Sequence, residues 1–204
     1  MPDVQNDYLV IIIVFGLAYM LGSFPTGIIV AKLFRLGNLR DIGSGNIGAT
    51  NVMRTGNKVA GLLTFLGDAL KGYIAVMIAT HYLPELMPVA AFVAVLGHMF
   101  PVWIGFEGGK GIATTVGILF GIHYSIGLIY VVVWAMTFWV FRVSAVAGIV
   151  ATAVIPLFAY VQLGLESALF MLCLSLLVIV RHSENIVRLI KGQEYVFSDT
   201  PRAQ

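Results

Sequence analysis

The stretch YLVIIIVFGLAYMLGSFPTGIIVAKLF, residues 8–34, decides the fold class of this chain. It contains no acidic residue, and its one charge, Lys32, lies near its end. A membrane-spanning helix needs ~20 consecutive, mostly apolar residues, so this stretch is long enough to cross a bilayer. The whole chain agrees, because 59% of its 204 residues are hydrophobic and only 11% are charged. Soluble domains carry roughly 25% charged residues. We therefore expect an all-α, polytopic membrane protein.

Six further apolar stretches follow the first one along the chain. The seven predicted spans are residues 8–34, 59–80, 87–103, 111–123, 125–141, 144–161 and 165–181. The fourth is short, and the sequence GIHYS, 121–125, separates it from the fifth. We therefore expect seven transmembrane helices that form a single integral membrane domain, residues 1–204.

The basic residues indicate how the spans are oriented. Lys and Arg collect on cytoplasmic loops. In the seven-span arrangement one side carries eleven of the twelve basic residues: Lys32, Arg35, Arg40, Arg54, Lys58, Lys110, Arg142, Arg181, Arg188, Lys191 and Arg202. The opposite side carries only acids and histidines, namely Asp3, Asp7, Glu85, Glu166, His81 and His123. This distribution predicts an N-terminus outside the cell and a C-terminus in the cytoplasm.

The twelfth basic residue, Lys71, lies inside the second span, three residues after Asp68. Charges within a bilayer are costly and usually face the bundle interior in pairs. Residues three apart are neighbours on a helix, so Thr64, Asp68 and Lys71 form one polar stripe. The stripe is either a buried ion pair that fixes helix packing or the support of a polar site. His98, near a predicted helix end, allows the same two interpretations.

Three polar stretches lie on the predicted cytoplasmic side. They are DIGSGNIGATNVMRTGNK (41–58), GHMFPVWIGFEGGKGIATT (97–115) and RHSENIVRLIKGQEY (181–195). Each combines glycines or amide side chains with a cation. Glycines let backbone N–H groups approach an anion closely, and a following helix N-terminus adds positive potential. On one helix, Arg181, Asn185 and Arg188 would share a face, with His182 beside Asn185. The three stretches together predict a site for one or more phosphate groups.

Several familiar motifs do not fit. GSGNIG, 43–48, matches G-x-G-x-x-G, but the dinucleotide fingerprint requires a preceding strand, and this motif links two membrane spans. GFEGGKG, 105–111, is one residue short of a Walker A motif and has Gly where Ser or Thr would hold magnesium. H-x4-D and G-x-S-x-G are both absent, which excludes two common acyltransferase and hydrolase arrangements. The single cysteine, Cys173, has no partner for a disulfide or a metal, and we interpret it as a packing residue.

GSGNIGATNVMRTGNK, GHMFPVWIGFEGGKG and RHSENIVRLIKGQE resemble the three cytoplasmic motifs of the bacterial acyl-phosphate:glycerol-3-phosphate acyltransferases, the PlsY family. LGSFPTG (21–27), GDALKG (67–72), the seven spans and the outside N-terminus are similar too, so the resemblance covers essentially the whole chain. It implies transfer of a fatty acyl group from acyl phosphate to the sn-1 hydroxyl of glycerol 3-phosphate. The products would be 1-acylglycerol 3-phosphate (lysophosphatidic acid) and phosphate. It also implies a bacterial cytoplasmic membrane protein with a cytoplasmic active site.

The resemblance carries over specific residues. The implied catalytic residues are Ser44, Arg54, Lys110 and His182. The implied substrate-binding residues are Asn46, Thr50, Asn51, Gly108, Gly109, Gly111, Asn185 and Arg188. Within this set we assign Lys110, His182 and Asn185, with Arg54, to glycerol 3-phosphate. Ser44, Thr50 and the backbone amides of the glycine loops are assigned to the acyl phosphate, and the base is either His182 or a phosphate oxygen of the substrate.

Acyl phosphate is already an activated mixed anhydride, so catalysis can rest on positioning and charge stabilisation without a protein nucleophile. The sequence shows no cluster of metal ligands, so we expect no metal, and we expect no cofactor. The expected partners are acyl phosphate, glycerol 3-phosphate and membrane lipid, without nucleic acid, and the expected state is a monomer. Glu107 departs from the family pattern, in which we expect a basic residue, and its charge would weaken the positive potential near Lys110.

Two other classes of protein were weighed. A small-anion transporter shares the glycine-broken elements and the intramembrane charge pair, but it predicts inverted repeats and a polar path to the outer face. The sequence has no internal repeat, and the outer loops lack a polar cluster. A scaffold protein does not need three amide- and cation-rich clusters.

Overall fold

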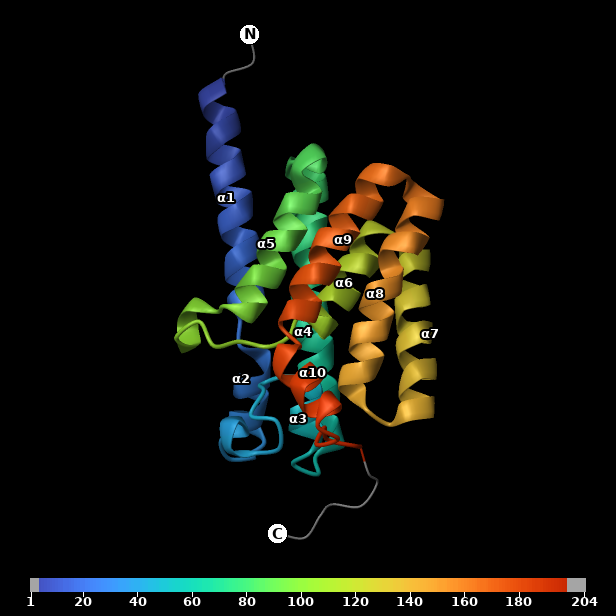
Figure 1. The fold of residues 1–204 in the computed structure, drawn as a ribbon. Helices are drawn as coiled ribbons and strands as arrows, with labels where there is room; N and C mark the ends of the chain where they lie inside the picture. The colour runs from blue at the N-terminus through green and yellow to red at the C-terminus, as the bar shows by residue number, and fades with distance from the viewer. Residues whose placement is uncertain (1–3, 198–204) are drawn as a thin grey trace.

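The computed structural model describes residues 4–197, and every regular element in that range is helical (Figure 1). Three 3-10 turns, Leu39–Asp41, Pro84–Leu86 and Val102–Ile104, join the α-helices. The α-helices are Val4–Ser23 (α1), Thr26–Leu33 (α2), Ala49–Met53 (α3), Lys58–Tyr82 (α4), Met87–Met99 (α5), Ile112–Ile122 (α6), Tyr124–Phe141 (α7), Ser144–Leu163 (α8), Leu165–Val180 (α9) and Ser183–Ile190 (α10). An all-α fold is confirmed for this part of the chain.

The first predicted span is broken. The expectation of one continuous helix over residues 8–34 is wrong, because α1 ends at Ser23 and α2 begins at Thr26. Pro25 lies in the break, where it has no N–H to donate and disfavours a helical conformation of Phe24. The Phe24 carbonyl left by the break accepts hydrogen bonds from the Thr26 N–H and the Lys71 Nζ, both at 2.9 Å. The buried Lys71 therefore both pairs with Asp68 and satisfies a carbonyl at the helix break.

Helix α4 occupies the middle of the bundle and packs against α1, α3, α5 and α6 (Figure 1). The Asn57 side chain caps its N-terminus by accepting from the Ala60 N–H at 2.9 Å. Helices α4 and α6 approach closely because each contributes a glycine: a Cβ on Gly72 would collide with the Thr114 carbonyl, and one on Gly117 with the Ala69 carbonyl. Small residues at helix interfaces are the usual means of close packing in membranes.

Helices α7, α8 and α9 form the other half of the bundle, and α8 packs against both neighbours. Polar groups between these helices are paired. The Tyr130 hydroxyl lies 3.0 Å from the Thr152 hydroxyl, and Ser175 donates to the Thr152 carbonyl at 2.8 Å. In lipid an unpaired polar group costs several kcal/mol, so these bonds fit a bundle surrounded by hydrocarbon.

The outer surface of the bundle is apolar and its interior is rich in alanine. Large side chains such as Ile12, Leu70, Trp139 and Val161 are exposed, whereas fourteen alanines of the described residues are buried. Cys173 lies on this outer surface, so the expectation that it is a packing residue is wrong. Such a surface would be unfavourable in water and is favourable in lipid.

Five segments are long and apolar enough to cross a membrane, and six if a bent pair counts as one span. The five are Tyr8–Leu33, Lys58–Tyr82, Pro84–Ile104, Tyr124–Phe141 and Ser144–Leu163, and the bent pair is α9 with α10. Apart from α2, helix α6 is the shortest of the helices at the predicted spans, and its 11 residues extend about 16 Å at 1.5 Å per residue. His123, in extended conformation, separates it from α7, which confirms the predicted break.

The chain bends by 59° between α9 and α10. Arg181 and His182 occupy the bend, so the expectation that Arg181, Asn185 and Arg188 share one helix face is wrong. The bend turns Arg181 toward Gly108 and Phe100, whereas Asn185 and Arg188 face Glu194. Helices α2, α3 and α10 all lie at the end of the bundle opposite the start of α1 (Figure 1).

Candidate functional site

A cavity of about 390 Å³ lies where the three polar stretches meet. Its polar lining consists of Ser44, Asn46, Thr50, Asn51, Arg54, Asp68, His98, Lys110, Ser144, His182, Asn185 and Glu194. One end is an apolar arm between α4 and α7, lined by Leu62, Phe65, Val131, Trp134 and Ala135. Leu62 and Val131 are also exposed on the outer surface, so the arm reaches the lipid-facing side of the bundle.

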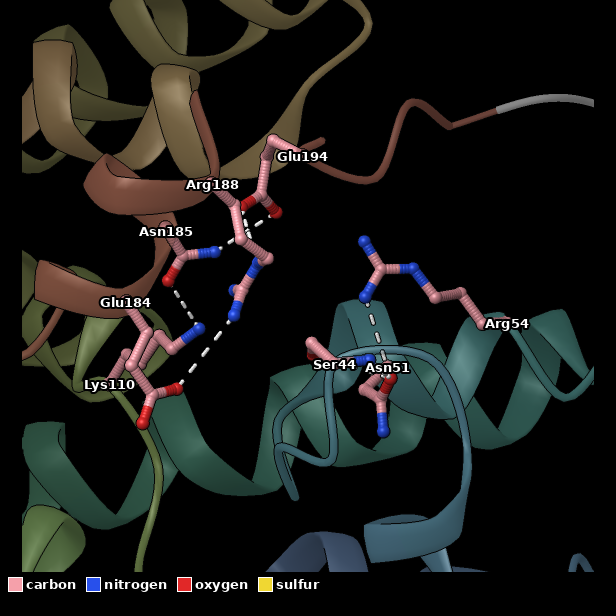
Figure 2. Close-up of polar contacts among 8 residues, drawn as sticks. All are labelled: Ser44, Asn51, Arg54, Lys110, Glu184, Asn185, Arg188 and Glu194. Carbon is pink, nitrogen blue, oxygen red and sulfur yellow. Dashed lines mark hydrogen bonds and ion pairs between the residues drawn. The ribbon is translucent and has the colours of Figure 1, made fainter. Parts of the chain in front are cut away.

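Asn51 organises the first polar stretch. It is 2% exposed, and its amide nitrogen donates to the Leu39 carbonyl at 2.9 Å. Its amide oxygen accepts from the Ser44 N–H at 3.1 Å and from the Ser44 hydroxyl and the Arg54 guanidinium, each at 3.4 Å (Figure 2). The hydrogen bonds of the Asn51 amide are thus made to other protein groups, and they fix the positions of Ser44 and Arg54 at the cavity.

The rest of this stretch forms a tight turn before α3. The Asn46 side chain accepts from the Gly48 N–H at 2.8 Å, and Gly48 caps α3. Thr50, in the first turn of α3, accepts a hydrogen bond from Ser144 on α8 at 3.1 Å. This bond connects the loop to the second half of the bundle. The first N–H groups of a helix have no acceptor within it, so this turn presents backbone donors beside the cavity.

A chain of polar contacts forms the second side of the cavity. Lys110 Nζ donates to the Asn185 amide oxygen at 2.5 Å, and the Asn185 nitrogen donates to Glu194 at 3.0 Å. Arg188 donates to the other Glu194 oxygen at 2.9 Å and lies 3.9 Å from Glu184. Figure 2 shows these residues facing Ser44, Asn51 and Arg54 across an open gap. Charges on two separate elements therefore converge on one space.

Tyr195 connects the two sides. Its ring lies under the Arg54 guanidinium, with 4.8 Å from the Arg54 Cζ to the ring centroid, and the corresponding distance for Arg188 is 5.7 Å. Stacking on the face of an aromatic ring stabilises a guanidinium without neutralising its charge. Arg54 therefore keeps its charge available to the cavity.

The glycine loop before α6 is held by the end of α5. The Gly108 N–H donates to the Met99 carbonyl at 3.0 Å, and the Gly109 N–H to the His98 carbonyl at 3.1 Å. The last carbonyls of a helix have no N–H donor within the helix, and here the N–H groups of the two glycines donate to them. These two amides are therefore not free to bind an anion as expected. Gly111 has φ of +87° and begins α6, where it lines the cavity.

The ion pair inside α4 supports this loop. Asp68 lies 2.7 Å from Lys71 Nζ and 3.6 Å from His98 Nδ1, and all three side chains are buried. The His98 ring lies against Gly109, where a Cβ would collide with Nε2. Both interpretations of the stripe therefore have a basis: Asp68 and Lys71 are paired, and through His98 they contact the loop that carries Lys110.

His182 is buried at the bend after α9, with 3% of its surface exposed. Its Nδ1 lies 2.8 Å from the Val178 carbonyl. A carbonyl only accepts, so Nδ1 carries the proton and Nε2 carries the lone pair. Burial lowers the pKa of His182 to about 4, the bond to Val178 opposes this, and Lys110 lowers it further. The imidazole is neutral near pH 7.

Burial also lowers the pKa of Lys110 to about 8. Arg188 adds to the decrease, whereas Glu194 and Glu184 oppose it. A bound phosphate would raise this pKa again, because a nearby negative charge favours the ammonium form.

The structure brings together most of the predicted residues. Nine line the cavity: Ser44, Asn46, Thr50, Asn51, Arg54, Lys110, Gly111, His182 and Asn185. Three predicted residues do not line the cavity: Gly108, Gly109 and Arg188. The two glycines bind the loop to the end of α5, and Arg188 donates to Glu194. Sequence reasoning missed Glu194, Tyr195 and Ser144. Glu194 could have been found as the acid at the end of the third stretch, but only the fold places Ser144 beside Thr50.

Glu107, the residue that departs from the family pattern, is paired with a cation other than Lys110. Its carboxylate pairs with Arg40 at 2.7 Å and is 71% exposed, and Arg40 also donates to the Glu107 carbonyl at 3.0 Å. The expected loss of positive potential at Lys110 is thus offset by Arg40.

Comparisons with known proteins agree with this arrangement. The family model described as glycerol-3-phosphate acyltransferase matches residues 12–192. The glycerol-3-phosphate acyltransferase of Jannaschia sp. (strain CCS1) is 51% identical over 195 residues, which cover 95% of this chain and 96% of the relative. That of Mesorhizobium japonicum is 45% identical over 186 residues, covering 91% and 94%.

Two solved structures are similar throughout. The crystal structure of PlsY (YgiH), an integral membrane glycerol 3-phosphate acyltransferase, in its glycerol 3-phosphate form matches with a TM-score of 0.86 and 41% identity. Its lysophosphatidic acid form matches with a TM-score of 0.83 and 39% identity. Each match covers 92% of this chain and 95% of the solved chain. The chain therefore belongs to the glycerol-3-phosphate acyltransferase family and is an integral membrane protein.

Proposed function

We propose that this protein transfers a fatty acyl group from acyl phosphate to the sn-1 hydroxyl of glycerol 3-phosphate. The products are 1-acylglycerol 3-phosphate and inorganic phosphate. The observation that carries the proposal is one cavity with a cationic end at Lys110 and Arg54 and an apolar arm at Phe65 and Trp134. Acyl phosphate and the product have the same two parts. The two similar solved structures are a glycerol 3-phosphate form and a lysophosphatidic acid form.

The arrangement supports catalysis by positioning. The acyl tail occupies the arm, and the phosphate groups bind between Arg54 on one side and Lys110 with Asn185 on the other. The glycerol hydroxyl attacks the acyl carbonyl carbon, the bond from that carbon to the phosphate oxygen breaks, and phosphate leaves with the electron pair. Two reactants held in contact gain a large entropic advantage, and fixed cations stabilise the charge on the departing phosphate.

The proton of the hydroxyl goes to a phosphate oxygen of the substrates. His182 was the other candidate, but its pKa of about 4 makes Nε2 the weaker base. A phosphate monoester has a second pKa of about 6 and is closer to the required basicity. His182 then orients the glycerol group. Ser44 and Thr50 bind phosphate oxygens, Asn46 and Gly111 shape the site, and Asn51 holds Ser44 and Arg54.

We further propose that α6 and α9 complete seven crossings. The N-terminus would then be outside and the C-terminus and cavity cytoplasmic, in the inner membrane of a bacterium. The support is the uneven distribution of Lys and Arg, the helices at all seven predicted stretches and the bacterial relatives. We expect residues 1–204 to act as one domain and as a monomer. A transporter is not favoured, because the arm of the cavity is apolar and reaches lipid.

The experiment is an assay of purified protein in detergent with palmitoyl phosphate and glycerol 3-phosphate. Phosphate and lysophosphatidic acid are measured together, with palmitoyl-CoA as a parallel donor. The proposal predicts one phosphate for each lysophosphatidic acid from acyl phosphate and no turnover of the CoA ester. Turnover of the CoA ester alone would retain the acyltransferase and refute the donor.

A further inference from the structure

A second chamber, of about 400 Å³, is lined in part by Phe106, Glu107, Gly108 and Lys110 of the glycine loop. It shares Ser44, Asn46 and Lys110 with the first cavity. Its remaining walls include Arg40, Glu107, Gly108, Arg181, Ser183 and Glu184, so its lining is mostly polar. No residue of the apolar arm contributes to it. The two chambers therefore differ in character and meet at Lys110.

Arg181 is a cation without a carboxylate partner in this chamber. Its guanidinium donates to the Gly108 carbonyl at 3.3 Å and lies 5.3 Å from the centroid of the Phe100 ring. Its Nε is buried and has no hydrogen-bond partner within residues 4–197. No Asp or Glu in that range lies within ion-pair distance of it. A buried donor without an acceptor is unfavourable, and a bound anion would satisfy it.

The two acids of the chamber are already paired. Glu107 contacts Arg40 at 2.7 Å on the exposed rim, and Glu184 lies 3.9 Å from Arg188. Lys110 contacts the neutral amide of Asn185, which leaves its charge unbalanced. Arg181 and Lys110 thus provide two positive charges, one in the second chamber and one at the boundary with the first.

We propose that the second chamber is a separate binding site for the phosphate group of a water-soluble compound, built on Arg181 and entered past the Arg40–Glu107 pair. The inference rests on the proposed function. If an acyl chain fills the apolar arm, water-soluble reactants need another way to reach the first cavity. Lys110, which lines both chambers, would be the next cation for a phosphate that moves from Arg181 into the first cavity. Two compounds carry this chemistry: glycerol 3-phosphate arriving and inorganic phosphate leaving.

The test is a kinetic comparison in detergent with palmitoyl phosphate as donor. We would measure the KM for glycerol 3-phosphate, which reports arrival, and the inhibition constant of inorganic phosphate, which reports departure. The variants are Arg181→Gln, Arg181→Lys and Glu107→Gln. Lys191→Gln is the matched control, because Lys191 is exposed and lines neither chamber.

Arg181→Gln is expected to raise at least one of the two constants by about tenfold, and Arg181→Lys to restore most of it. Glu107→Gln removes an acid and frees Arg40, so the same constant should fall by about twofold. A thermal unfolding scan reports whether Arg181→Gln is folded. If it is not, the expected decrease in the same constant for Glu107→Gln tests the inference. The exposed position of Glu107 makes that variant safe for folding.

Two results would overturn the inference while leaving the acyltransferase intact. In one, Arg181→Gln is folded and matches Lys191→Gln in both constants. In the other, Glu107→Gln leaves both constants unchanged. Absence of turnover in the wild-type protein would instead refute the proposed function. Inorganic phosphate binding, measured by calorimetry, would then still test the chamber, since Arg181→Gln should weaken or abolish one binding event.

Discussion

Two clusters of charge lie within the same bundle and differ in how their charges are balanced. The buried charge cluster consists of Asp68, Lys71 and His98, and its ammonium has a carboxylate at 2.7 Å. The cavity cation cluster consists of Arg54, Lys110 and Glu194, which line the cavity, together with Arg188 and Glu184, which do not line it. Arg188 pairs with both Glu194 and Glu184. In the second cluster three cations face two carboxylates, and Lys110 contacts only a neutral amide.

The difference indicates which cluster is structural and which binds a ligand. A buried ion pair that is complete has no remaining capacity for an anion, and its main requirement is that neither partner be lost. A cluster with excess positive charge at a cavity becomes fully satisfied only when an anion binds. Charge balance, rather than the presence of charge, distinguishes the two regions.

The largest expected effect is on stability, at the balanced cluster. Asp68→Leu leaves Lys71 buried and uncompensated, which costs about 3–5 kcal/mol in comparable cases. The double variant Asp68→Leu/Lys71→Met should recover most of that loss. Thermal unfolding in detergent measures both. A single variant as stable as the wild type, or a double variant less stable than the single, would break the comparison.

The next largest effect is on activity, at the unbalanced cluster. Lys110→Ala removes a charge-assisted contact to phosphate, so kcat/KM for glycerol 3-phosphate should fall by about 100-fold or more. Lys191→Ala, an exposed cation outside both chambers, is the control and should change little. Equal activities of the two variants would show that excess charge at the cavity is not used.

Gly109→Ala tests how the two clusters are connected. The new Cβ would collide with the His98 ring, so the loop that carries Lys110 must shift. A displacement of about 1 Å at a site can reduce the rate by ~100-fold, and we expect a loss of at least about tenfold in kcat/KM. Gly16→Ala, where no atom lies within 4 Å of the new Cβ, is the control. Unchanged activity of Gly109→Ala would separate the buried cluster from catalysis.

The pH dependence sharpens the comparison, because it follows one charge of the unbalanced cluster. Burial lowers the pKa of Lys110 to about 8, so the ammonium is present below that pH and lost as pH rises through it. The value of kcat/KM for glycerol 3-phosphate should therefore fall by about tenfold between pH 8 and 9.5. Lys110→Arg should remove this decline, because arginine stays charged. An identical decline in that variant would assign it to another group.

The smallest expected effect is in the apolar arm, which carries no charge. Val131→Trp narrows the arm on the α7 side, so the KM for palmitoyl phosphate should rise about threefold. A short-chain acyl phosphate should be unaffected, and the ratio of the two KM values measures the effect. A similar change for both donors would place the acyl chain elsewhere.

Sequence reasoning predicted the helices and the convergence of the polar stretches well, because apolar length and glycine-rich polar loops are local properties. It missed the break at Pro25, although the sequence GSFPTG, 22–27, interrupts the apolar run and proline disfavours a continuous helix. It also missed the bend at Arg181 and His182, which sends Arg181 to a different chamber from Asn185. Whether Gly108 and Gly109 offer free amides depends on α5, a helix whose end can be placed only by the fold.

The most direct test of the account is the increase in unfolding temperature that glycerol 3-phosphate produces in three proteins. These are the wild type, Lys110→Ala and the double variant Asp68→Leu/Lys71→Met. A ligand that binds only the folded state raises its stability in proportion to RT ln(1 + [L]/Kd). The account predicts that the double variant keeps most of the wild-type increase and that Lys110→Ala loses it. Loss of the increase in the double variant, with retention in Lys110→Ala, would contradict it.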